Sequence, residues 1–426
     1  MTENSTQGFA TRAVHAGAVP DPSTGARSVP ITQATAFVFK DADHAASLFG
    51  LEEMGFIYSR LTNPTVSVFQ ERVASLEGGV GATCTASGHS AQLLAMFALM
   101  ENGDDFVASN KLYGGSITQF GHTFKKFGWN VIFVDPVDPE NFRKAITPKT
   151  KAVFTESLAN PGGVICDIEK ISEIAHEAGV PCIVDNTLPS PALCRPFEFG
   201  ADIVVHSTTK FISGHGNAMG GAVVDSGNFN WSQNDKFKSL TESCDAYHGL
   251  NFYETFGPMA YTLFCHAVGL RDLGPTMSAM NAFLSLTGAE TLQLRMKKHA
   301  DNALEVATWL SKHDAVEWVS YAGLSDSPFY SLAQKYCPEG AGAVFTFGVK
   351  GGYEAGTKVV DQCKLFSHVA NIGDTRSLII HPASTTHRQL TEEQQISAGA
   401  GPEVVRLSIG IEDAEDIIAD LDQALS

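Results

Sequence analysis

Short apolar runs alternate with amphipathic stretches through the middle of the chain. Six runs, several of them almost continuously apolar, lie at residues 105–109, 130–135, 151–157, 181–187, 201–207 and 221–225. Strands that are buried on both faces of a parallel sheet have this pattern. Residues 168–179 (IEKISEIAHEAG) are typical of a helix between two of these strands. The alternation predicts an α/β fold with a mostly parallel sheet and helices on both of its sides.

The pattern changes near residue 286. Apolar residues recur every three or four positions across 299–313, which predicts a helix with one buried face. Residues 343–352 and 403–412 alternate as strands do, and 412–425 closes the chain as an amphipathic helix with acids in its first turn. We therefore expect a second, smaller α/β domain at the C-terminal end.

The first 62 residues differ from both later parts. They are rich in turn formers and aromatic residues, as in VPDPSTGARSVP and IYSRLTNPT, and show little helical periodicity. We expect an extended arm that contacts a partner subunit. The chain is thus divided into an arm (1–62), a large domain (63–285) and a C-terminal domain (286–426).

The composition narrows the class of protein. The chain has 426 residues and a formal net charge of −18, which disfavours binding to nucleic acid or to anionic membranes. No stretch reaches the ~18 uninterrupted apolar residues of a membrane span, and the N-terminus lacks the apolar region of a secretory signal. The eight cysteines include no C-x-x-C pair. We expect reduced thiols in a soluble, cytoplasmic protein.

A lysine follows one of the buried strands. In ADIVVHSTTKFISGHG the strand ends in hydroxyl residues, and Lys210 and glycines come next. Open α/β sheets bind ligands at the carboxyl ends of their strands, where Ser207 and Thr209 could donate hydrogen bonds to a phosphate. A lysine that loses its charge near neutral pH can form an imine with an aldehyde. A surface lysine after a strand explains this segment alone equally well.

A carboxylate ends another strongly apolar strand, PCIVDNT. Asp185 is expected at the same edge of the sheet as Lys210. Burying a carboxylate is costly unless a cation faces it, and the protonated ring nitrogen of pyridoxal phosphate (PLP) would be such a cation. A helix N-cap is the alternative role for Asp185. The two residues together favour PLP.

Two further motifs are weaker signals. In TASGHSAQ, Gly88 and His89 open an apolar helix whose free backbone N–H groups could bind an anion, although many helices begin this way. In KLYGGS, Tyr113 could stack on a flat ring or be an ordinary loop aromatic. A P-loop is excluded, because the sequence has no G-x-x-x-x-G-K-[ST] motif.

Taken together, the motifs resemble one known family, the Cys/Met-metabolism PLP-dependent enzymes, and most closely their O-acetylhomoserine sulfhydrylase branch. The chain contains, in order, TRAVHAG, YSRLTNPT, LEGG, SGHSA, LYGG, ESLANP, VDNT, HSTTKFISGHG, GDTRSLIIHPASTTH and VRLSIGIED. The resemblance implies the fold of PLP-dependent transferases of fold-type I: an N-terminal arm, a large PLP-binding domain with a mostly parallel sheet, and a smaller C-terminal α/β domain.

The resemblance also implies the cofactor contacts. Lys210 would carry PLP as a Schiff base, and Asp185 would face the pyridine nitrogen. Tyr113 would stack over the ring and assist Lys210 in catalysis. Further cofactor contacts would come from Gly88, His89, Thr187, Ser207 and Thr209.

Two more groups of residues receive roles from the resemblance. Tyr58 and Arg60 would reach the PLP phosphate of a neighbouring subunit, so that active sites are shared in a homo-oligomer, which we expect to be a tetramer. Arg406 would bind the α-carboxylate of the substrate with its planar fork, assisted by Asn160 and Ser377.

The reaction implied is a γ-replacement. O-acetyl-L-homoserine and sulfide, or a small thiol such as methanethiol, would give L-homocysteine or methionine, together with acetate. The γ-lyases of methionine or cystathionine use the same residues. The length of the chain, the motif NIGDTRSL and the segment 228–252 favour the sulfhydrylase branch by resemblance, although that segment would not discriminate if it were a surface loop over the site entrance.

The sequence departs from the usual family pattern at three places. ESLANP and DNTLPSP replace the more usual ETIGNP and DNTFATP, and His89 stands where Met or Gln is common, which bears on substrate preference. A catalytically silent PLP-binding scaffold would not need to keep Lys210 and its partners. A metal site at His381 and His387 lacks the helical spacing and the nearby carboxylate of such sites, and we expect none.

Overall fold

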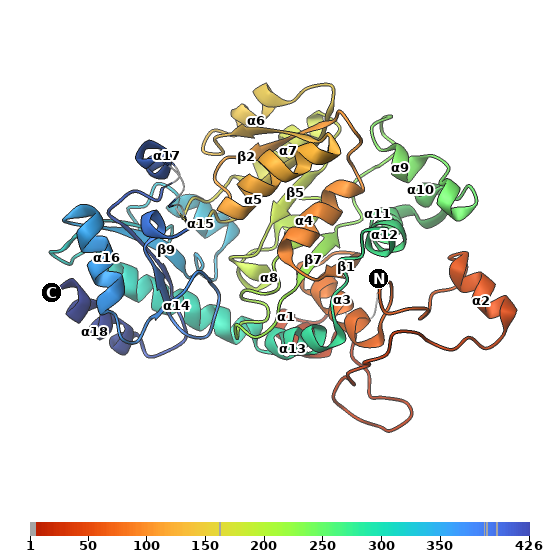
Figure 1. The fold of residues 1–426 in the computed structure, drawn as a ribbon, viewed down its shortest axis with the longest axis horizontal. Helices are drawn as coiled ribbons and strands as arrows, with labels where there is room; N and C mark the ends of the chain where they lie inside the picture. The colour runs from red at the N-terminus through yellow and green to blue at the C-terminus, as the bar shows by residue number, and fades with distance from the viewer. Residues whose placement is uncertain (1–5, 162, 387, 389–390, 398) are drawn as a thin grey trace.

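A seven-stranded sheet forms the centre of the larger part of the molecule (Figure 1). The structure is a computed structural model that describes residues 6–161, 163–386, 388, 391–397 and 399–426. The strand order is β1-β7-β6-β5-β4-β2-β3. The strands are β1 (Gly81–Thr85), β2 (Asp105–Ser109), β3 (Asn130–Val134), β4 (Thr150–Glu156), β5 (Cys182–Asp185), β6 (Ile203–His206) and β7 (Gly221–Asp225).

This sheet confirms the predicted fold class. Strands β6, β5, β4, β2 and β3 pair in parallel, while β7 runs antiparallel to both of its neighbours. The six predicted strands are all present. Strand β1 was missed, because GATCT (81–85) contains no Val, Ile, Leu or aromatic residue and so is not recognisable as an apolar run.

Successive residues of each strand point to opposite faces of the sheet, and both faces are covered. Val153 and Val184 belong to a buried cluster with helices α3 (Pro64–Glu77) and α7 (Ile168–Glu177). Phe154 and Ile183 belong to a second cluster on the other face, with helix α4 (Gly88–Phe97). The two-sided burial explains why these strands are almost continuously apolar in sequence.

The C-terminal part contains a second, five-stranded sheet. Its order is β10-β11-β12-β9-β8, with strands β8 (Val316–Ser320), β9 (Val344–Val349), β10 (Ser367–His368), β11 (Leu378–Ile380) and β12 (Val404–Ser408). The main helices around it are α14 (Leu292–Leu310), α15 (Tyr330–Tyr336), α16 (Gly352–Gln362) and α18 (Ala414–Leu425). The predicted strands and helices of this part are confirmed. The boundary at residue 286 stays a prediction, and it lies within helix α13 (Ala279–Glu290).

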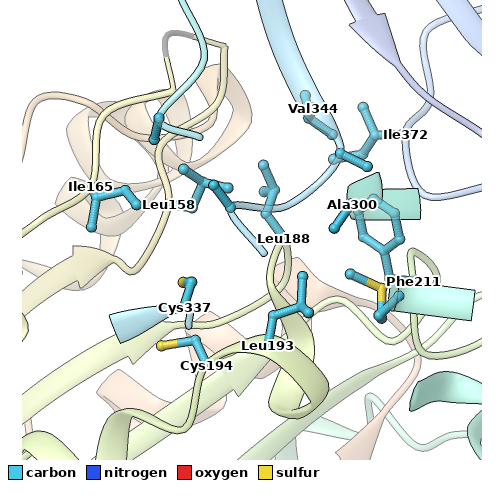
Figure 2. Close-up of a cluster of buried hydrophobic side chains, with 14 of the residues drawn as sticks. Leu158, Ile165, Leu188, Leu193, Cys194, Phe211, Ala300, Cys337, Val344 and Ile372 are labelled. Carbon is cyan, nitrogen blue, oxygen red and sulfur yellow. The ribbon is translucent and has the colours of Figure 1, made fainter. Parts of the chain in front are cut away.

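One apolar cluster joins the two parts. Figure 2 shows side chains from loops of the first sheet, among them Leu158 and Phe211, beside Ala300 of α14 and Val344 of β9. All four side chains are buried. The ends of the parallel strands are therefore held against the C-terminal part by continuous packing.

The N-terminal arm contains more helix than its sequence predicted. Helices α1 (Phe9–His15) and α2 (Ala42–Phe49) lie within it, both shorter than the window in which periodicity is readable. Arg72 of α3 fixes the first of them, because its guanidinium donates to the carbonyls of Ala13 and Ala16.

The rest of the arm leaves the body of the molecule (Figure 1, lower right). Val38, Phe49 and Met54 are 98%, 62% and 70% exposed there, an unusual density of uncovered apolar side chains.

Two further findings concern the described residues. All eight cysteines lie within them and are free thiols, six of them buried. No helix in this part of the chain has the length and apolar character that crossing a membrane requires.

Candidate active site

A cavity of about 320 Å³ lies at the carboxyl ends of strands β4, β5 and β6, where residues 370–372 from the C-terminal part complete its wall. Its volume falls within the usual range for small-molecule sites. Ten of the thirteen residues predicted for the site line this cavity: Gly88, His89, Tyr113, Asn160, Asp185, Thr187, Ser207, Thr209, Lys210 and Arg406.

Lys210 comes shortly after β6, and its side chain ends inside the cavity. Its Nζ donates a hydrogen bond of 2.5 Å to Oδ1 of Asn371. Burial, and next the positive charge of Arg406, lower the pKa of Lys210 to about 8. A fraction of this amine is therefore uncharged near neutral pH, as imine formation and proton transfer require.

Asp185 is the last residue of β5. Its Oδ1 accepts the N–H of Thr187 at 3.0 Å, and its Oδ2 accepts Nε2 of Gln92 at 3.2 Å. Burial raises the pKa of Asp185, and the hydrogen bonds from Thr187 and Gln92 oppose that rise. None of the ion pairs between described residues includes this carboxylate. Asp185 is thus suited to a cation that a ligand brings.

The start of helix α4 offers backbone N–H groups to an anion. Ser87 is its N-cap, and the Ser87 hydroxyl accepts the N–H of Ser90 at 3.2 Å. A Cβ atom on Gly88 would lie 2.7 Å from Cβ of Ser207, so only glycine lets the helix come this close to the residues that follow β6. The N–H groups of this helix start and the hydroxyl of Ser207 make a cradle that is suited to a phosphate.

Two threonines fix the loops around this cradle. Thr187 accepts the N–H of Ser207 on its hydroxyl at 2.8 Å. The hydroxyl of Thr209 donates to the carbonyl of Gly220 and accepts the N–H of the same residue. The hydroxyls therefore brace the backbone as well as lining the cavity.

Tyr113 and Asn160 are tied to one buried carboxylate. Glu156, the last residue of β4, accepts the N–H of Tyr113 on Oε1 at 2.6 Å and that of Asn160 on Oε2 at 3.3 Å. Burial, and next the neighbouring carboxylate of Asp185, raise the pKa of Glu156 well above its ordinary value. The ring of Tyr113 is 5.9 Å from the ring of His89 and remains 49% exposed.

Arg406 enters the cavity from strand β12 of the second sheet. Its guanidinium donates to Oδ1 of Asn160 at 3.4 Å and to the backbone carbonyl of Asn371 at 3.2 Å. Burial lowers the pKa of Arg406 to about 10. Within the described residues, Arg406 belongs to no ion pair. This buried cation is suited to the carboxylate of a substrate.

Three predicted residues do not line this cavity. Tyr58 is 41% exposed on the arm, and the guanidinium of Arg60 stacks on its ring at 5.1 Å. Ser377 is fully buried; its hydroxyl donates to Glu412 at 3.0 Å and accepts the N–H of Gly410 at 2.9 Å. Ser377 therefore does not line this cavity, and its role in substrate binding stays a prediction.

Sequence reasoning gave no site role to Glu156, Gln92 or Asn371. Glu156 ends an apolar strand as Asp185 does, so the same rule could have found it. Gln92 lies one helical turn after Gly88 on α4, a spacing that is readable once the start of the helix is known. Asn371 is far from Lys210 in sequence, and only the packing of the two parts of the molecule brings them together.

Two other sequence hypotheses can be compared with the structure. Within segment 228–252 no described residue lines the cavity, and Trp231 is instead stacked on Tyr261 with ring centroids 5.3 Å apart. The lining of the cavity therefore gives no support to the idea that this segment covers the site entrance. Nε2 of His381 makes a hydrogen bond with the carbonyl of Pro402, and His387 lies outside the described residues.

The donor set of the cavity fits PLP. The cradle at α4 suits a phosphate, Asp185 suits a cationic ring nitrogen, and the uncharged fraction of Lys210 suits an aldehyde. The fold and this set of groups define a PLP-dependent enzyme of fold-type I. The family model "Cys/Met metabolism PLP-dependent enzyme" matches residues 10–426. The chain belongs to this family.

Similar proteins share nearly the whole chain. The O-acetyl-L-homoserine sulfhydrylase of Leptospira meyeri is 53% identical over 97% of this chain and 96% of its own length. The homocysteine synthase of Schizosaccharomyces pombe is 48% identical over 98% of both chains.

A solved structure has the same fold as this chain. The Campylobacter jejuni protein assigned as an O-acetylhomoserine (thiol)-lyase is 41% identical, covers 98% of this chain and superposes with a TM-score of 0.95. That protein carries N′-pyridoxyl-lysine-5′-monophosphate at its own position 205.

Proposed function

We propose that this protein is an O-acetylhomoserine sulfhydrylase, which converts O-acetyl-L-homoserine and sulfide, or a small thiol, into L-homocysteine, or the matching thioether, and acetate. The observation that carries the proposal is the likeness to relatives of this name, at 46–53% identity over nearly their whole length. The cavity supports it, because an amino acid and a cofactor would both find groups of opposite charge there.

The chain's own residues would hold PLP at three points. Lys210 would bind its aldehyde carbon, Asp185 would face its ring nitrogen, and the N–H groups of Gly88 and His89 would bind its phosphate with the hydroxyl of Ser207. When bound, PLP supplies an electron sink for the carbon atoms next to the substrate amine. The ring of Tyr113 is exposed in the same cavity, where it would cover one face of the cofactor ring.

Proton transfer would fall to Lys210. An amine with a pKa of about 8 can accept the proton from Cα of the substrate and deliver it nearby, since both of its forms are populated near neutral pH. Loss of acetate from Cγ and addition of sulfide to the same carbon complete the exchange. Asp185 would keep the ring nitrogen protonated throughout. Tyr113 would assist the acid and base steps.

Substrate orientation would depend on Arg406. Its planar guanidinium can bind both oxygens of an α-carboxylate, and Asn160 holds it from the side. A fixed carboxylate places Cα and Cβ at set distances from the amine of Lys210.

The arm would complete the site of another subunit. Tyr58 and Arg60 are exposed and lie on a segment with uncovered apolar side chains, as expected for a part of the chain that packs on a partner. We propose a homo-oligomer with shared active sites, a tetramer, in which Arg60 approaches the phosphate of a neighbour. With eight free cysteines the protein suits the reducing cytoplasm.

The proposal is tested with the purified protein, PLP and O-acetyl-L-homoserine, each assay being run with and without sulfide. We expect homocysteine and acetate only when sulfide is present. Lys210→Arg, which keeps the charge but cannot form the imine readily, should abolish the product. Abundant 2-oxobutyrate and ammonia without sulfide would instead identify a γ-lyase.

A further inference from the structure

One residue, Asn371, contacts both cations of the site. Oδ1 of Asn371 accepts the hydrogen bond from Nζ of Lys210 at 2.5 Å. The backbone carbonyl of Asn371 accepts a hydrogen bond from Nη2 of Arg406 at 3.2 Å. A single residue therefore contacts both the group that would move protons and the group that would bind the substrate carboxylate.

The position of Asn371 is fixed by its backbone. Its N–H donates to the carbonyl of Val369 at 2.9 Å, and the N–H of Gly373 donates to the hydroxyl of Ser408 at 3.0 Å. Gly373 has φ +75, and a Cβ atom there would lie 2.8 Å from N of Phe211 and 3.0 Å from C of Lys210. The segment that contains Asn371 and Gly373 thus packs directly against the backbone of Lys210, and this packing fixes the position of Asn371.

Resting on the proposed function, we propose that Asn371 is a positioning residue that holds the amine of Lys210 in one orientation and stabilises its protonated form. An amide oxygen can only accept a hydrogen bond from an amine. It binds a protonated ammonium group more strongly than a neutral amine. Asn371 thereby opposes burial and Arg406, which both favour the uncharged form.

Five other charged or titratable groups line the cavity, and the two carboxylates among them accept hydrogen bonds from groups other than Lys210. The carboxylate of Asp185 accepts hydrogen bonds from Gln92 and Thr187, and Glu156 accepts backbone N–H groups. Arg406, the ring of His89 and the phenol of Tyr113 complete the set. Asn371, which is neither charged nor titratable, supplies the hydrogen-bond acceptor for the amine of Lys210.

The test uses two variants with opposite expectations. Asn371→Ala removes the acceptor, so the pKa of Lys210 should fall, by about one unit. Asn371→Asp keeps the shape and adds a negative charge, so that pKa should rise, by at least ~1 unit. The pKa is measured on the full chain freed of cofactor, by competitive acetylation from about pH 6 to 10 and quantification of the Lys210 peptide. A merely structural role of Asn371 would not shift the pKa of Lys210 in opposite directions in the two variants.

A matched control and a second measurement complete the design. Asn302→Ala removes a buried amide that bonds the carbonyls of Gly410 and Glu412 away from the cavity, and it should lower thermal stability without moving the Lys210 pKa. The second measurement is the rate at which the holoenzyme exchanges the α-proton of L-norvaline with D₂O. The pH at which this rate rises should be lower than in the wild type for Asn371→Ala and higher for Asn371→Asp.

The outcomes separate this inference from the proposed function. If both variants leave the Lys210 pKa unchanged, or move it in the same direction, Asn371 does not have this role. Asn371→Ser keeps a short acceptor, so its Lys210 pKa should lie between those of the wild type and Asn371→Ala. This variant replaces Asn371→Ala in the test if the alanine variant does not fold. Failure of the wild type to make homocysteine would overturn the proposed function but would leave the acetylation result valid.

Discussion

At the scale of single residues, the site contains two charged groups, Asp185 and Arg406, that form no ion pair with another described residue. Asp185 accepts hydrogen bonds from an amide and a backbone N–H, and Arg406 donates to an amide and a backbone carbonyl. An ionised group in such a place costs stability until an opposite charge arrives. Both residues therefore favour a ligand that is cationic near Asp185 and anionic near Arg406.

Arg406→Lys tests this reading of the arginine. Lysine keeps the positive charge but loses the fork that binds two oxygens at once. We expect KM for O-acetyl-L-homoserine to rise by ~10- to 100-fold, with a smaller change in kcat, because one charged hydrogen bond is lost. Steady-state kinetics measure both values. Arg376→Lys is the control, since that side chain is 69% exposed in its ion pair with Asp374, and its KM should match the wild type.

At the scale of elements, the start of helix α4 decides how the cofactor phosphate can bind. Gly88→Ala would place a methyl group 2.7 Å from Cβ of Ser207 and push the helix away from the end of β6. Overpacking of this kind costs ~1–3 kcal/mol, so we expect affinity for PLP to fall by about 10-fold or more. Titration of the cofactor-free protein, followed by tyrosine and tryptophan fluorescence, measures the change.

A second glycine provides the comparison for this prediction. Gly121 lies in the short helix Gln119–Thr123, where an added Cβ would meet only Phe133, at an ordinary distance of 3.7 Å. Gly121→Ala should therefore bind PLP as the wild type does. Equal affinity of the two variants would mean that the close approach at Gly88 has no bearing on the cofactor.

The sequence predicted those elements whose hydrophobic pattern is strong. Buried parallel strands are apolar runs wherever they occur, so β2 and β7 were predicted with their observed bounds. Asp185 and Lys210 could be placed because strand ends meet at one edge of a sheet. Asn371 could not, since its contact with Lys210 depends on how two separate sheets pack. The bond between the Ser377 hydroxyl and Glu412 could not be predicted either, because no local pattern shows this contact.

At the scale of the whole molecule, the proposed oligomer would make the active site a property of more than one chain. Arg60 and Tyr58 lie outside the cavity of their own subunit, and the proposed assembly would bring them to a neighbour. Each site would then contain Lys210 from one chain and Arg60 from another. The apolar side chains of the arm would gain their burial in the same step.

Mixing two inactive variants tests this sharing. Lys210→Ala and Arg60→Ala should each have very low activity, whereas subunits exchanged between them should form some sites with both groups intact. For random pairing at equal amounts we expect recovery of about a quarter of wild-type activity per site. Homocysteine formation after co-refolding measures it. No recovery, in mixtures shown to contain hybrid oligomers, would mean that each site takes both residues from the same chain.

The state of the cysteines has a consequence for the chemistry proposed here. Hydrosulfide is a nucleophile that cleaves disulfide bonds. An enzyme that consumes hydrosulfide is therefore exposed to a substrate that could reduce its own disulfide bonds. All eight thiols of this chain are free, and burial raises the pKa of Cys84 and Cys265 so that they remain unreactive thiols. The fold therefore has no disulfide bond for its co-substrate to break.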